Sequence, residues 1–376
     1  MPPRGVILMT RTLGHGGTER QLTEVALSLN RELFTPHIAC VEGHGFRADE
    51  LRANGVSILE LPFSSFASLK CIAAIARLRQ YLRRHKIGLV HTFDTTMNVF
   101  GVPAAKLAGV PVVLSSQRCF ENVIWPPHRR PTRIAHRLAD GVVVNCQALE
   151  QHLLRDYSLP GRKIHICRNG LDTSVFAPGP AARPRPDRLR DAGLVIGSVC
   201  VLRPEKDLAT LLEAFALVRD VRPGLMLRIV GSGPVREALE TRAMELGLKG
   251  VCHFYPASED VASWLHTIDV FVLPSLSEAF SNSLMEAMAC ECCAIASNVG
   301  GNPELVRHGE TGLLFEPGNS SDLADQLRAI ALDDILRNRL ARTGSEWVST
   351  HLSREVAARR MEEIYLDHMG ARAEGR

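Results

Sequence analysis

Short apolar runs and amphipathic stretches alternate along the first half of the chain. Runs typical of strands occur at Val6–Met9, His37–Val41, Val56–Leu61, Leu89–Phe93, Val112–Leu114, Val142–Val144 and Ile164–Cys167. Stretches with helical periodicity lie between them, at Gln21–Leu33, Ala67–Lys86, Val102–Ala108 and Gln147–Tyr157. Strands that alternate with helices predict parallel β-α-β units joined by right-handed crossovers.

The same alternation restarts after a proline-rich segment. Residues 177–187 contain four prolines and few apolar side chains, which predicts a linker or a joint between domains. Beyond this segment, strands are predicted at Leu194–Leu202, Leu225–Val230, Cys252–Phe254, Val270–Leu273 and Ala294–Ala296, with helices that start at Asp207 and Pro234. A charged amphipathic helix is expected from Ser353 to about Met369.

Two doubly wound parallel sheets in tandem are therefore the predicted architecture, in the α/β class. The length of 376 residues suits two domains better than one core. Sheets of this kind bind ligands at the carboxyl ends of their strands. The space between two such sheets is the expected ligand site.

Composition narrows the class of protein. Hydrophobic residues make up 45% of the chain and charged residues 23%, which is typical of globular proteins. Because no export signal is recognisable at the start, we expect the ten cysteines to be reduced thiols in a cytoplasmic protein. At Cys290, Cys292 and Cys293 we expect small buried thiols rather than a zinc site.

Charge is divided unevenly between the two halves. Residues 1–175 carry 22 Lys and Arg against 13 Asp and Glu, whereas residues 176–376 carry 22 against 28. A basic half is suited to nucleic acid, to an anionic membrane surface or to a phosphorylated substrate. Aromatic residues are only 5% of the chain, which disfavours base stacking, so no nucleic-acid partner is expected.

Glycines and basic residues follow predicted strands at two points where a phosphate would bind. Gly14, Gly16 and Gly17 open the first helix, where glycines admit a ligand close to the backbone and free N–H groups attract an anion. An ordinary strand-to-helix turn is the alternative.

Arg203 and Lys206 follow the first strand of the second half, and their cationic groups suit a diphosphate. A solvated cluster of loop charges is the alternative there.

Residues 277–289 place two carboxylates around a predicted helix start. Ser281 or Asn282 is the expected helix cap. Glu278 would stand in the preceding loop and Glu286 on the first helical turns, with the positive helix end offered to a phosphate between them. Two such carboxylates can bind the hydroxyls of a sugar and a ribose. A favourable acid on a surface helix is the alternative for Glu286.

Further motifs complete an ordered series along nearly the whole chain. The series is Gly14-x-Gly16-Gly17, Arg168-Asn169-Gly170-x-Asp172, Pro204-Glu205-Lys206, Val230-Gly231-x-Gly233-Pro234, Glu278 with Glu286, and Gly300-Gly301-x-Pro303-Glu304. With it the chain resembles the retaining glycosyltransferases of family four, within glycosyl transferases group 1, which have the GT-B fold. The resemblance implies an acceptor-side domain over residues 1–173 and a nucleotide-sugar domain over residues 174–352, facing across a cleft. We expect the helix in residues 353–376 to pack back on the first domain.

The resemblance also implies a reaction and residue roles. A sugar would move from a nucleotide-diphosphate sugar to an acceptor hydroxyl, with retention of configuration and without a metal or other cofactor. Lys206 and Arg203 would bind the diphosphate, Glu278 a sugar hydroxyl and Glu286 the ribose. The other expected donor-binding residues are Gly16, Gly17, Gly231, Phe280, Ser281, Asn282, Ser283 and Leu284. We favour a UDP-sugar over a GDP-sugar, a hexosyl or N-acetylhexosaminyl group, and a lipid-linked or polysaccharide glycan as acceptor.

Several positions depart from the family pattern. Val201 stands where the family has a phosphate-binding arginine, with Arg203 as the candidate substitute, and Glu291 replaces a glycine. Gln117 ends the strand where many members carry a histidine near the reacting sugar. His91 is then the candidate catalytic histidine, and a structural role is its alternative. The expected acceptor-side residues are Asp94, Gln117, Arg118 and Asn169.

These departures leave two alternative functions open. A degenerate, non-catalytic GT-B protein would act as a binding or scaffold subunit. A sugar-nucleotide epimerase would share the architecture but would need acid–base residues around the sugar.

The basic half predicts contact with an anionic membrane or a lipid-diphosphate acceptor, on the inner face of the membrane. On the predicted helix 68–86, Cys71, Ile75, Leu78 and Leu82 share one face, and Arg77, Arg79, Arg83, Arg84 and Lys86 lie largely away from it. The segment 125–133 adds Trp125 to basic residues in a predicted loop. In the alternative, the helix packs its apolar face on its own domain and its charges are only solvated.

Overall fold

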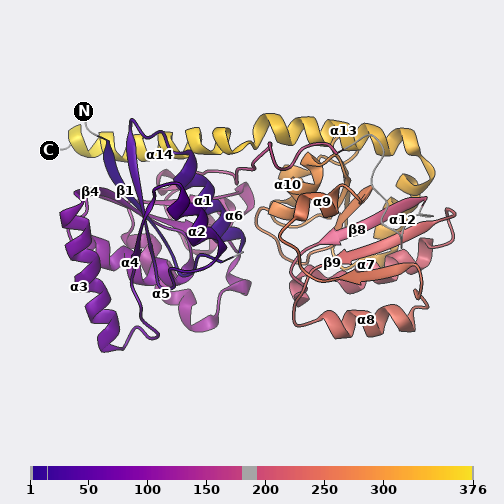
Figure 1. The fold of residues 1–376 in the computed structure, drawn as a ribbon, viewed down its shortest axis with the longest axis horizontal. Helices are drawn as coiled ribbons and strands as arrows, with labels where there is room; N and C mark the ends of the chain where they lie inside the picture. The colour runs from indigo at the N-terminus through magenta and orange to yellow at the C-terminus, as the bar shows by residue number, and fades with distance from the viewer. Residues whose placement is uncertain (1–2, 15, 180–192, 375–376) are drawn as a thin grey trace. The chain divides into compact units, whose positions relative to one another are not determined.

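The computed structural model describes residues 3–14, 16–179 and 193–374, and it divides into two compact units (Figure 1). Unit 1 comprises residues 1–170 and 354–376, and unit 2 comprises residues 171–353. The domain limits expected from the sequence, after residues 173 and 352, lie close to these. Most of the predicted linker 177–187 lies outside the described residues.

Unit 1 is built on a seven-stranded parallel sheet with the order β3-β2-β1-β4-β5-β6-β7. Its strands are β1 (Arg4–Thr10), β2 (Phe34–Cys40), β3 (Ser57–Glu60), β4 (Ile87–Thr92), β5 (Val112–Gln117), β6 (Gly141–Val144) and β7 (Ile164–Ile166). Its helices are α1 (Gly17–Ser28), α2 (Phe46–Ala53), α3 (Leu69–Arg84), α4 (Thr95–Leu107), α5 (Pro126–Leu138), α6 (Gln147–Asp156) and α14 (Arg354–Glu374).

Alternate side chains of the strands in unit 1 enter two separate cores. Val6 and Leu8 of β1 pack with residues of α1, α2 and α14, whereas Ile7 and Met9 pack with α3, α4 and α5. Successive residues of a strand point to opposite faces, so a strand buried on both faces reads as a continuous apolar run. Figure 1 shows α14 running beside α1, and Tyr365 of α14 meets Phe34 edge-on at 5.9 Å.

Unit 2 contains a six-stranded parallel sheet with the order β10-β9-β8-β11-β12-β13. Its strands are β8 (Leu194–Val199), β9 (Leu225–Val230), β10 (Cys252–Tyr255), β11 (Val270–Leu273), β12 (Cys293–Ser297) and β13 (Leu313–Phe315). Its helices are α7 (Leu208–Val218), α8 (Arg236–Glu245), α9 (Val261–Leu265), α10 (Asn282–Ala289), α11 (Asn302–Leu305), α12 (Ser320–Leu332) and α13 (Asp334–His351). Two parallel α/β units of this kind confirm the predicted doubly wound architecture.

A loop was predicted around Trp125. This prediction is wrong, because the segment continues into helix α5. Pro126 and Pro127 occupy the first helical positions, where a missing N–H costs nothing. Ala135 and His136 are buried further along the same helix. Two early prolines therefore started a helix here rather than preventing one.

The apolar face of α3 is covered by unit 1 itself. Cys71, Leu78 and Leu82 belong to the core between α3 and the sheet, and Ile75 packs against it. This confirms the alternative in which the helix packs its apolar face on its own domain. None of the described helices combines the length and apolar character that a membrane crossing requires.

Candidate functional site

In unit 2, the predicted donor-binding residues follow three neighbouring strands at the same edge of the sheet. Arg203 and Lys206 come after β8, Gly231 after β9 and Glu278 after β11. Because parallel strands end at one edge, the topology brings these loops together. The Leu276 amide donates to the Glu205 carbonyl oxygen at 2.9 Å, which ties the loop after β11 to the loop after β8.

Lys206 and Glu278 form an ion pair between these two loops. The Lys206 Nζ lies 2.5 Å from Glu278 Oε2, which also accepts a hydrogen bond from Ser275 Oγ at 3.2 Å. The two side chains are 18% and 14% exposed. Burial lowers the pKa of Lys206, but the Glu278 charge and hydrogen bond oppose it, and the net pKa is raised. Lys206 therefore stays cationic, as a phosphate contact requires.

The amino end of α10 lies beyond this pair. Ser281 is its cap, and Ser281 Oγ accepts the Leu284 amide at 3.3 Å, which confirms one of the two caps predicted. Phe280 and Leu284 are buried, so only their backbone groups can meet a ligand. Asn282 and Ser283 form the first helical positions, so their backbone N–H groups lie at the amino end of the helix.

Glu286 is buried, as are all residues of α10 from Leu284 to Ala289. Its exposed fraction is only 5%, which excludes the alternative of an acid on a surface helix. A buried carboxylate is costly unless polar partners meet it, so this position is not explained by helix propensity. The sequence correctly predicted that Glu286 lies on the helix, but it did not predict that the side chain is buried.

Gly231 permits a close approach between two of the site loops. Its φ is +155°, and a Cβ atom there would overlap the Cys200 carbonyl oxygen. A Cβ atom on Gly233 would likewise overlap the backbone of Leu202. Both glycines are therefore required by the packing of the loop after β9 on the loop after β8, whatever the ligand.

The positions that depart from the family pattern have distinct environments. Val201 is 51% exposed. The Arg203 side chain is 58% exposed, and its ion pair with Glu205 is long, at 3.9 Å. Glu291 has φ +60°, the left-handed region that a glycine adopts readily and other residues adopt at a cost. The turn keeps its glycine-like conformation although the glycine is absent.

In unit 1, the amino end of α1 already has an acid beside it. Gly16 is the cap residue and Gly17 the first helical residue. The Glu19 carboxylate lies where a Cβ atom of Gly16 would stand, and it accepts a hydrogen bond from Thr12 Oγ1 at 2.7 Å. A phosphate at this helix end would meet that negative charge, which weakens the phosphate-binding role expected for Gly16 and Gly17.

The catalytic role expected for His91 needs correction. Its side chain is fully buried, with Nδ1 2.8 Å from Tyr365 Oη and Nε2 2.8 Å from Ser116 Oγ. Burial, followed by the nearby Arg118 and His368, lowers the pKa of His91 well below its usual value. Both ring nitrogens are occupied inside the core, so the structural alternative describes His91.

Gln117 is also part of an internal network. Its Oε1 lies 2.9 Å from His136 Nε2, and its Nε2 donates to the Cys119 carbonyl oxygen at 2.7 Å. His136 Nδ1 meets Ser115 Oγ at 2.8 Å, and burial lowers the pKa of His136 to about 3. His136 was not predicted from the sequence, because no residue pattern pairs it with Gln117, 19 residues earlier.

The other expected acceptor-side residues hold loops of unit 1. Arg118 Nη1 donates to Asn169 Oδ1 at 2.9 Å, and its guanidinium lies 4.8 Å from the Phe93 ring centre. Burial lowers the pKa of Arg118 to about 10. Asp94 caps α4 by accepting the Met97 amide at 2.9 Å, and burial raises its pKa against the hydrogen bonds it accepts.

The described part of the chain contains no cluster of three His, Cys, Asp or Glu side chains suited to a metal ion. All ten cysteines are free thiols, and Cys290, Cys292 and Cys293 are buried, as expected. Burial raises the pKa of Cys293 to about 12. The Cys293 thiol is therefore a protonated core residue.

Both units match known families. Residues 15–175 match the family described as Glycosyltransferase Family 4, and residues 184–347 match Glycosyl transferases group 1. A D-inositol 3-phosphate glycosyltransferase of Arthrobacter sp. (strain FB24) is 28% identical over 294 residues, 73% of this chain and 69% of the relative. A GDP-mannose-dependent alpha-(1-6)-phosphatidylinositol monomannoside mannosyltransferase of Mycobacterium tuberculosis is 27% identical over 329 residues, 84% of this chain and 85% of the relative.

Solved structures show the same fold. Anabaena Alr3699/HepE, crystallised with UDP and glucose, superposes with a TM-score of 0.84 and 19% identity, over 97% of this chain and all of that one. Sucrose-phosphate synthase (tll1590) of Thermosynechococcus elongatus superposes with a TM-score of 0.82 and 20% identity, over 98% of this chain and 100% of that one. Each unit therefore matches a glycosyltransferase family model, and the chain has the GT-B fold of these enzymes.

Proposed function

We propose that this protein transfers a hexosyl or N-acetylhexosaminyl group from a UDP-sugar to an acceptor hydroxyl, with retention of configuration. The observation that carries the proposal is the Lys206–Glu278 pair between the loops after β8 and β11, with the amino end of α10 and the buried Glu286 next along the chain. A cation, a capped helix end and two carboxylates are what a nucleotide sugar needs: charge for its phosphates and acceptors for its hydroxyls.

Each residue of this set has a role in the proposal. Lys206 has three N–H donors, so it can bind a diphosphate oxygen while it keeps its contact with Glu278. Arg203 would supply the second cation in place of the arginine absent at Val201. Glu278 would hold a sugar hydroxyl and Glu286 the ribose. The first-turn amides at Asn282 and Ser283 would stabilise the charge that develops on the leaving diphosphate.

The acceptor proposed is a lipid-linked or polysaccharide glycan. The two curated relatives act, by their names, on an inositol phosphate and on a phosphatidylinositol mannoside, so a phosphorylated polyol headgroup is the first acceptor to test. The UDP bound to HepE favours UDP as the nucleotide of the donor, and the GDP-mannose of the mycobacterial relative makes GDP the alternative nucleotide.

Thermal unfolding with UDP and with GDP tests the donor site directly. A ligand at 100 times its dissociation constant stabilises the folded state by about 2.7 kcal/mol. We expect UDP to raise Tm in the wild type and to raise it much less in Lys206→Ala. Equal stabilisation of both proteins would move the diphosphate away from Lys206.

Turnover distinguishes the remaining functions. Incubation with UDP-sugars and a lipid extract should give a glycosylated product with the donor's anomeric configuration, with or without EDTA. An isomerised donor would support the epimerase alternative, and nucleotide binding without turnover the degenerate alternative. Loss of activity in EDTA, restored by magnesium or manganese, would contradict the metal-independent reaction.

We also propose that the protein acts as a cytoplasmic enzyme at the inner face of a membrane, through its basic first half. The basic residues at the start of α5 support this proposal. A lipid-linked acceptor would be met at that surface.

A further inference from the structure

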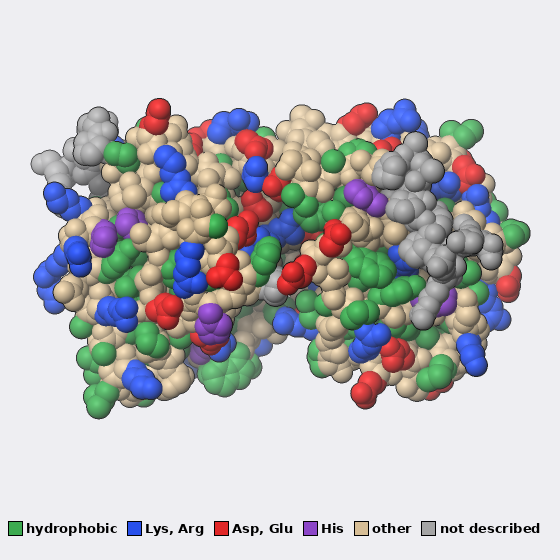
Figure 2. Space-filling view, viewed as in Figure 1, with side chains coloured by type: hydrophobic (Ala, Val, Ile, Leu, Met, Phe, Trp, Pro, Cys, Tyr) green, Lys and Arg blue, Asp and Glu red, His purple; other side chains and the backbone are tan. Residues whose placement is uncertain are grey.

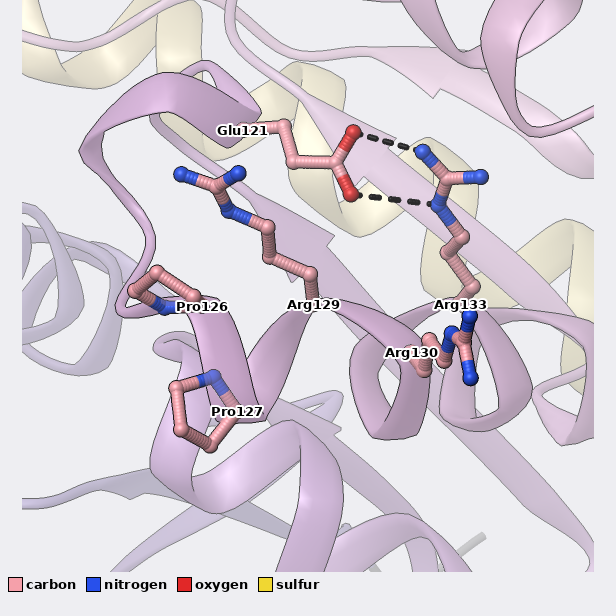
Figure 3. Close-up of a pocket in the computed structure, with 6 residues that line it drawn as sticks. All are labelled: Glu121, Pro126, Pro127, Arg129, Arg130 and Arg133. Atoms are coloured by element: carbon pink, nitrogen blue, oxygen red, sulfur yellow. Dashed lines mark hydrogen bonds and ion pairs between the residues drawn. The ribbon is translucent and has the colours of Figure 1, made fainter.

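A basic pocket lies at the start of α5 in unit 1 (Figure 3). Its volume is about 370 Å³, and it is lined by Glu121, Pro126, Pro127, Arg129, Arg130 and Arg133. Sites for small ligands have volumes of about 300–1,000 Å³, so the pocket is large enough for a phosphorylated headgroup. None of these residues belongs to the donor site of unit 2.

The pocket has an excess of positive charge. Arg133 binds both oxygens of Glu121, with Nη2 2.6 Å from Oε2 and Nε 3.2 Å from Oε1 (Figure 3). Arg129 uses its Nε on the Ile124 carbonyl oxygen, at 3.1 Å, which leaves its two terminal nitrogens. Within the described residues, neither Arg129 nor Arg130 pairs with a carboxylate. Two guanidinium groups at the pocket therefore lack a counter-ion.

Side chains rather than backbone amides would hold an anion here. Pro126 and Pro127 take the first helical positions and have no N–H, and the next amide, of His128, bonds the Trp125 carbonyl oxygen at 2.9 Å. Guanidinium groups bind phosphate through paired, charge-assisted hydrogen bonds. Arg129 and Arg130 are therefore the binding groups of the pocket.

Exposed apolar side chains lie near the pocket in the sequence. Trp125 is 65% exposed, and Val123, Ile134 and Leu138 of the same segment are 47%, 56% and 49% exposed. The His128 ring lies 5.0 Å from Trp125 and 5.7 Å from Phe66, which joins this segment to the start of α3. Two residues there, Leu69 and Ile72, are 83% and 63% exposed and one helical turn apart.

Apolar and basic side chains are thus neighbours on one part of unit 1. Figure 2 shows hydrophobic and basic side chains side by side where Figure 1 draws α3. Single exposed apolar residues are common, but a connected group of them marks a binding surface. Tryptophan together with arginine is typical of the membrane–water interface, where the ring lies at headgroup level and the cation meets phosphate.

We propose that the α5 pocket and its apolar rim bind the phosphate of an anionic lipid headgroup in a bilayer. Arg129 and Arg130 bind the phosphate, and Trp125 with Leu69 and Ile72 enters the headgroup layer. The apolar rim is the reason to choose a lipid over a free phosphate. The inference rests on the proposed function only in that it names the surface at which the lipid-linked acceptor is met.

Sedimentation with vesicles tests this site, using the full chain without a nucleotide sugar. Vesicles of phosphatidylcholine alone are compared with vesicles that also contain phosphatidylglycerol. We expect the wild type to bind the anionic vesicles, and the double variant Arg129→Gln/Arg130→Gln to bind them about thirtyfold less tightly. That factor corresponds to about 1 kcal/mol for each basic side chain at an anionic leaflet.

The matched control is Arg77→Gln/Arg79→Gln on the exposed side of α3. It removes the same charge from the same unit, outside the pocket. We expect it to lower vesicle binding less than the pocket variant does, because neither side chain lines the pocket. Trp125→Ala should weaken binding even at high salt, since burial of its ring does not depend on charge.

Three results would overturn the proposal. An equal loss in both double variants would show unspecific charge attraction. Failure of the wild type to bind either kind of vesicle would exclude a membrane-binding surface at this pocket. Stabilisation by pyrophosphate that disappears in Arg129→Gln/Arg130→Gln, without vesicle binding, would assign the pocket to a soluble phosphate. The shift of Tm by UDP in the same proteins reports the donor site independently, so the two proposals fail separately.

Discussion

The polar side chains near the strand ends have different environments in the two units. In unit 2, Lys206 and Glu278 form a charged pair that remains partly exposed. In unit 1, His91 and Gln117 lie in neutral hydrogen-bond networks inside the core. Charged groups kept at strand ends are available to a ligand, whereas neutral groups with all their partners inside the protein stabilise its fold. The comparison supports the proposed donor site in unit 2, whereas the buried histidines of unit 1 have their hydrogen-bond partners within the protein.

The largest effect should come from breaking the charged pair. We expect Lys206→Ala to lower turnover about a hundred- to thousandfold, equivalent to about 2.7–4 kcal/mol, because one cation that meets the developing phosphate charge is lost. Glu286→Ala should lower turnover to a similar degree. Initial rates at saturating donor are the measurement.

A double variant separates charge from stability at this site. Lys206→Ala also removes the cation from the Glu278 carboxylate and leaves it only the hydrogen bond from Ser275, which destabilises unit 2. Lys206→Met/Glu278→Gln removes both charges, so it should recover stability but not turnover. If turnover recovers as well, the pair is structural and the donor site is misplaced.

The contrasting change in unit 1 is His91→Phe. It removes the partner of both Tyr365 Oη and Ser116 Oγ, and each unsatisfied buried hydroxyl costs about 1–3 kcal/mol. We expect a lower free energy of unfolding in urea with near-normal turnover of the folded enzyme. Tyr365→Phe, which removes one of the two contacts, should cost less. A fall in turnover like that of Lys206→Ala, without loss of stability, would restore His91 to the reaction.

Acid should weaken unit 1 through its buried histidines. The folded pKa of His136 is lowered to about 3 by burial, against 6.5 as the ordinary value. Below pH 6.5 the unfolded chain therefore binds a proton at His136 that the folded chain does not bind. The free energy of unfolding is at its full value above pH 6.5 and falls as the pH drops below it. At pH 5 the loss is about 2 kcal/mol for this histidine, from 1.36 kcal/mol per pH unit.

Hydrogen exchange measured at pH 7 and pH 5 checks this expectation. Amides of unit 1 should lose protection at pH 5, and His136→Gln should show a smaller dependence on pH even though it is less stable at pH 7. His165, whose pKa burial lowers to about 4, should add to the same trend. Equal loss of protection in the two units would contradict the assignment to unit 1.

The smallest effect concerns the turn after α10. Glu291 adopts φ +60°, and the left-handed conformation costs a residue with a Cβ atom about 1–2 kcal/mol. We expect Glu291→Gly to raise the free energy of unfolding by about 1 kcal/mol, with Glu291→Ala as the control that removes the side chain but keeps the strain. If both variants behave alike, the side chain and not the backbone governs this turn.

The sequence by itself determined the sheets and the loops that carry the donor site. β11 begins and ends where its apolar run does, because a strand buried on both faces needs apolar side chains at every position. Lys206 and Glu278, 72 residues apart, were expected at one edge because parallel strands end together. Ser281 was among the predicted caps because its hydroxyl suits a helix start.

Tertiary structure alone decided which polar residues face a ligand and which are enclosed. His91 meets Tyr365, 274 residues further along the chain, and no local pattern relates a strand end to a C-terminal helix. The same holds for Gln117 with His136 and for the burial of Glu286. The periodicity of apolar residues predicts the helix or strand to which a residue belongs. The exposure and the pKa of its side chain depend on the other elements packed against it, and only the folded chain brings those into contact.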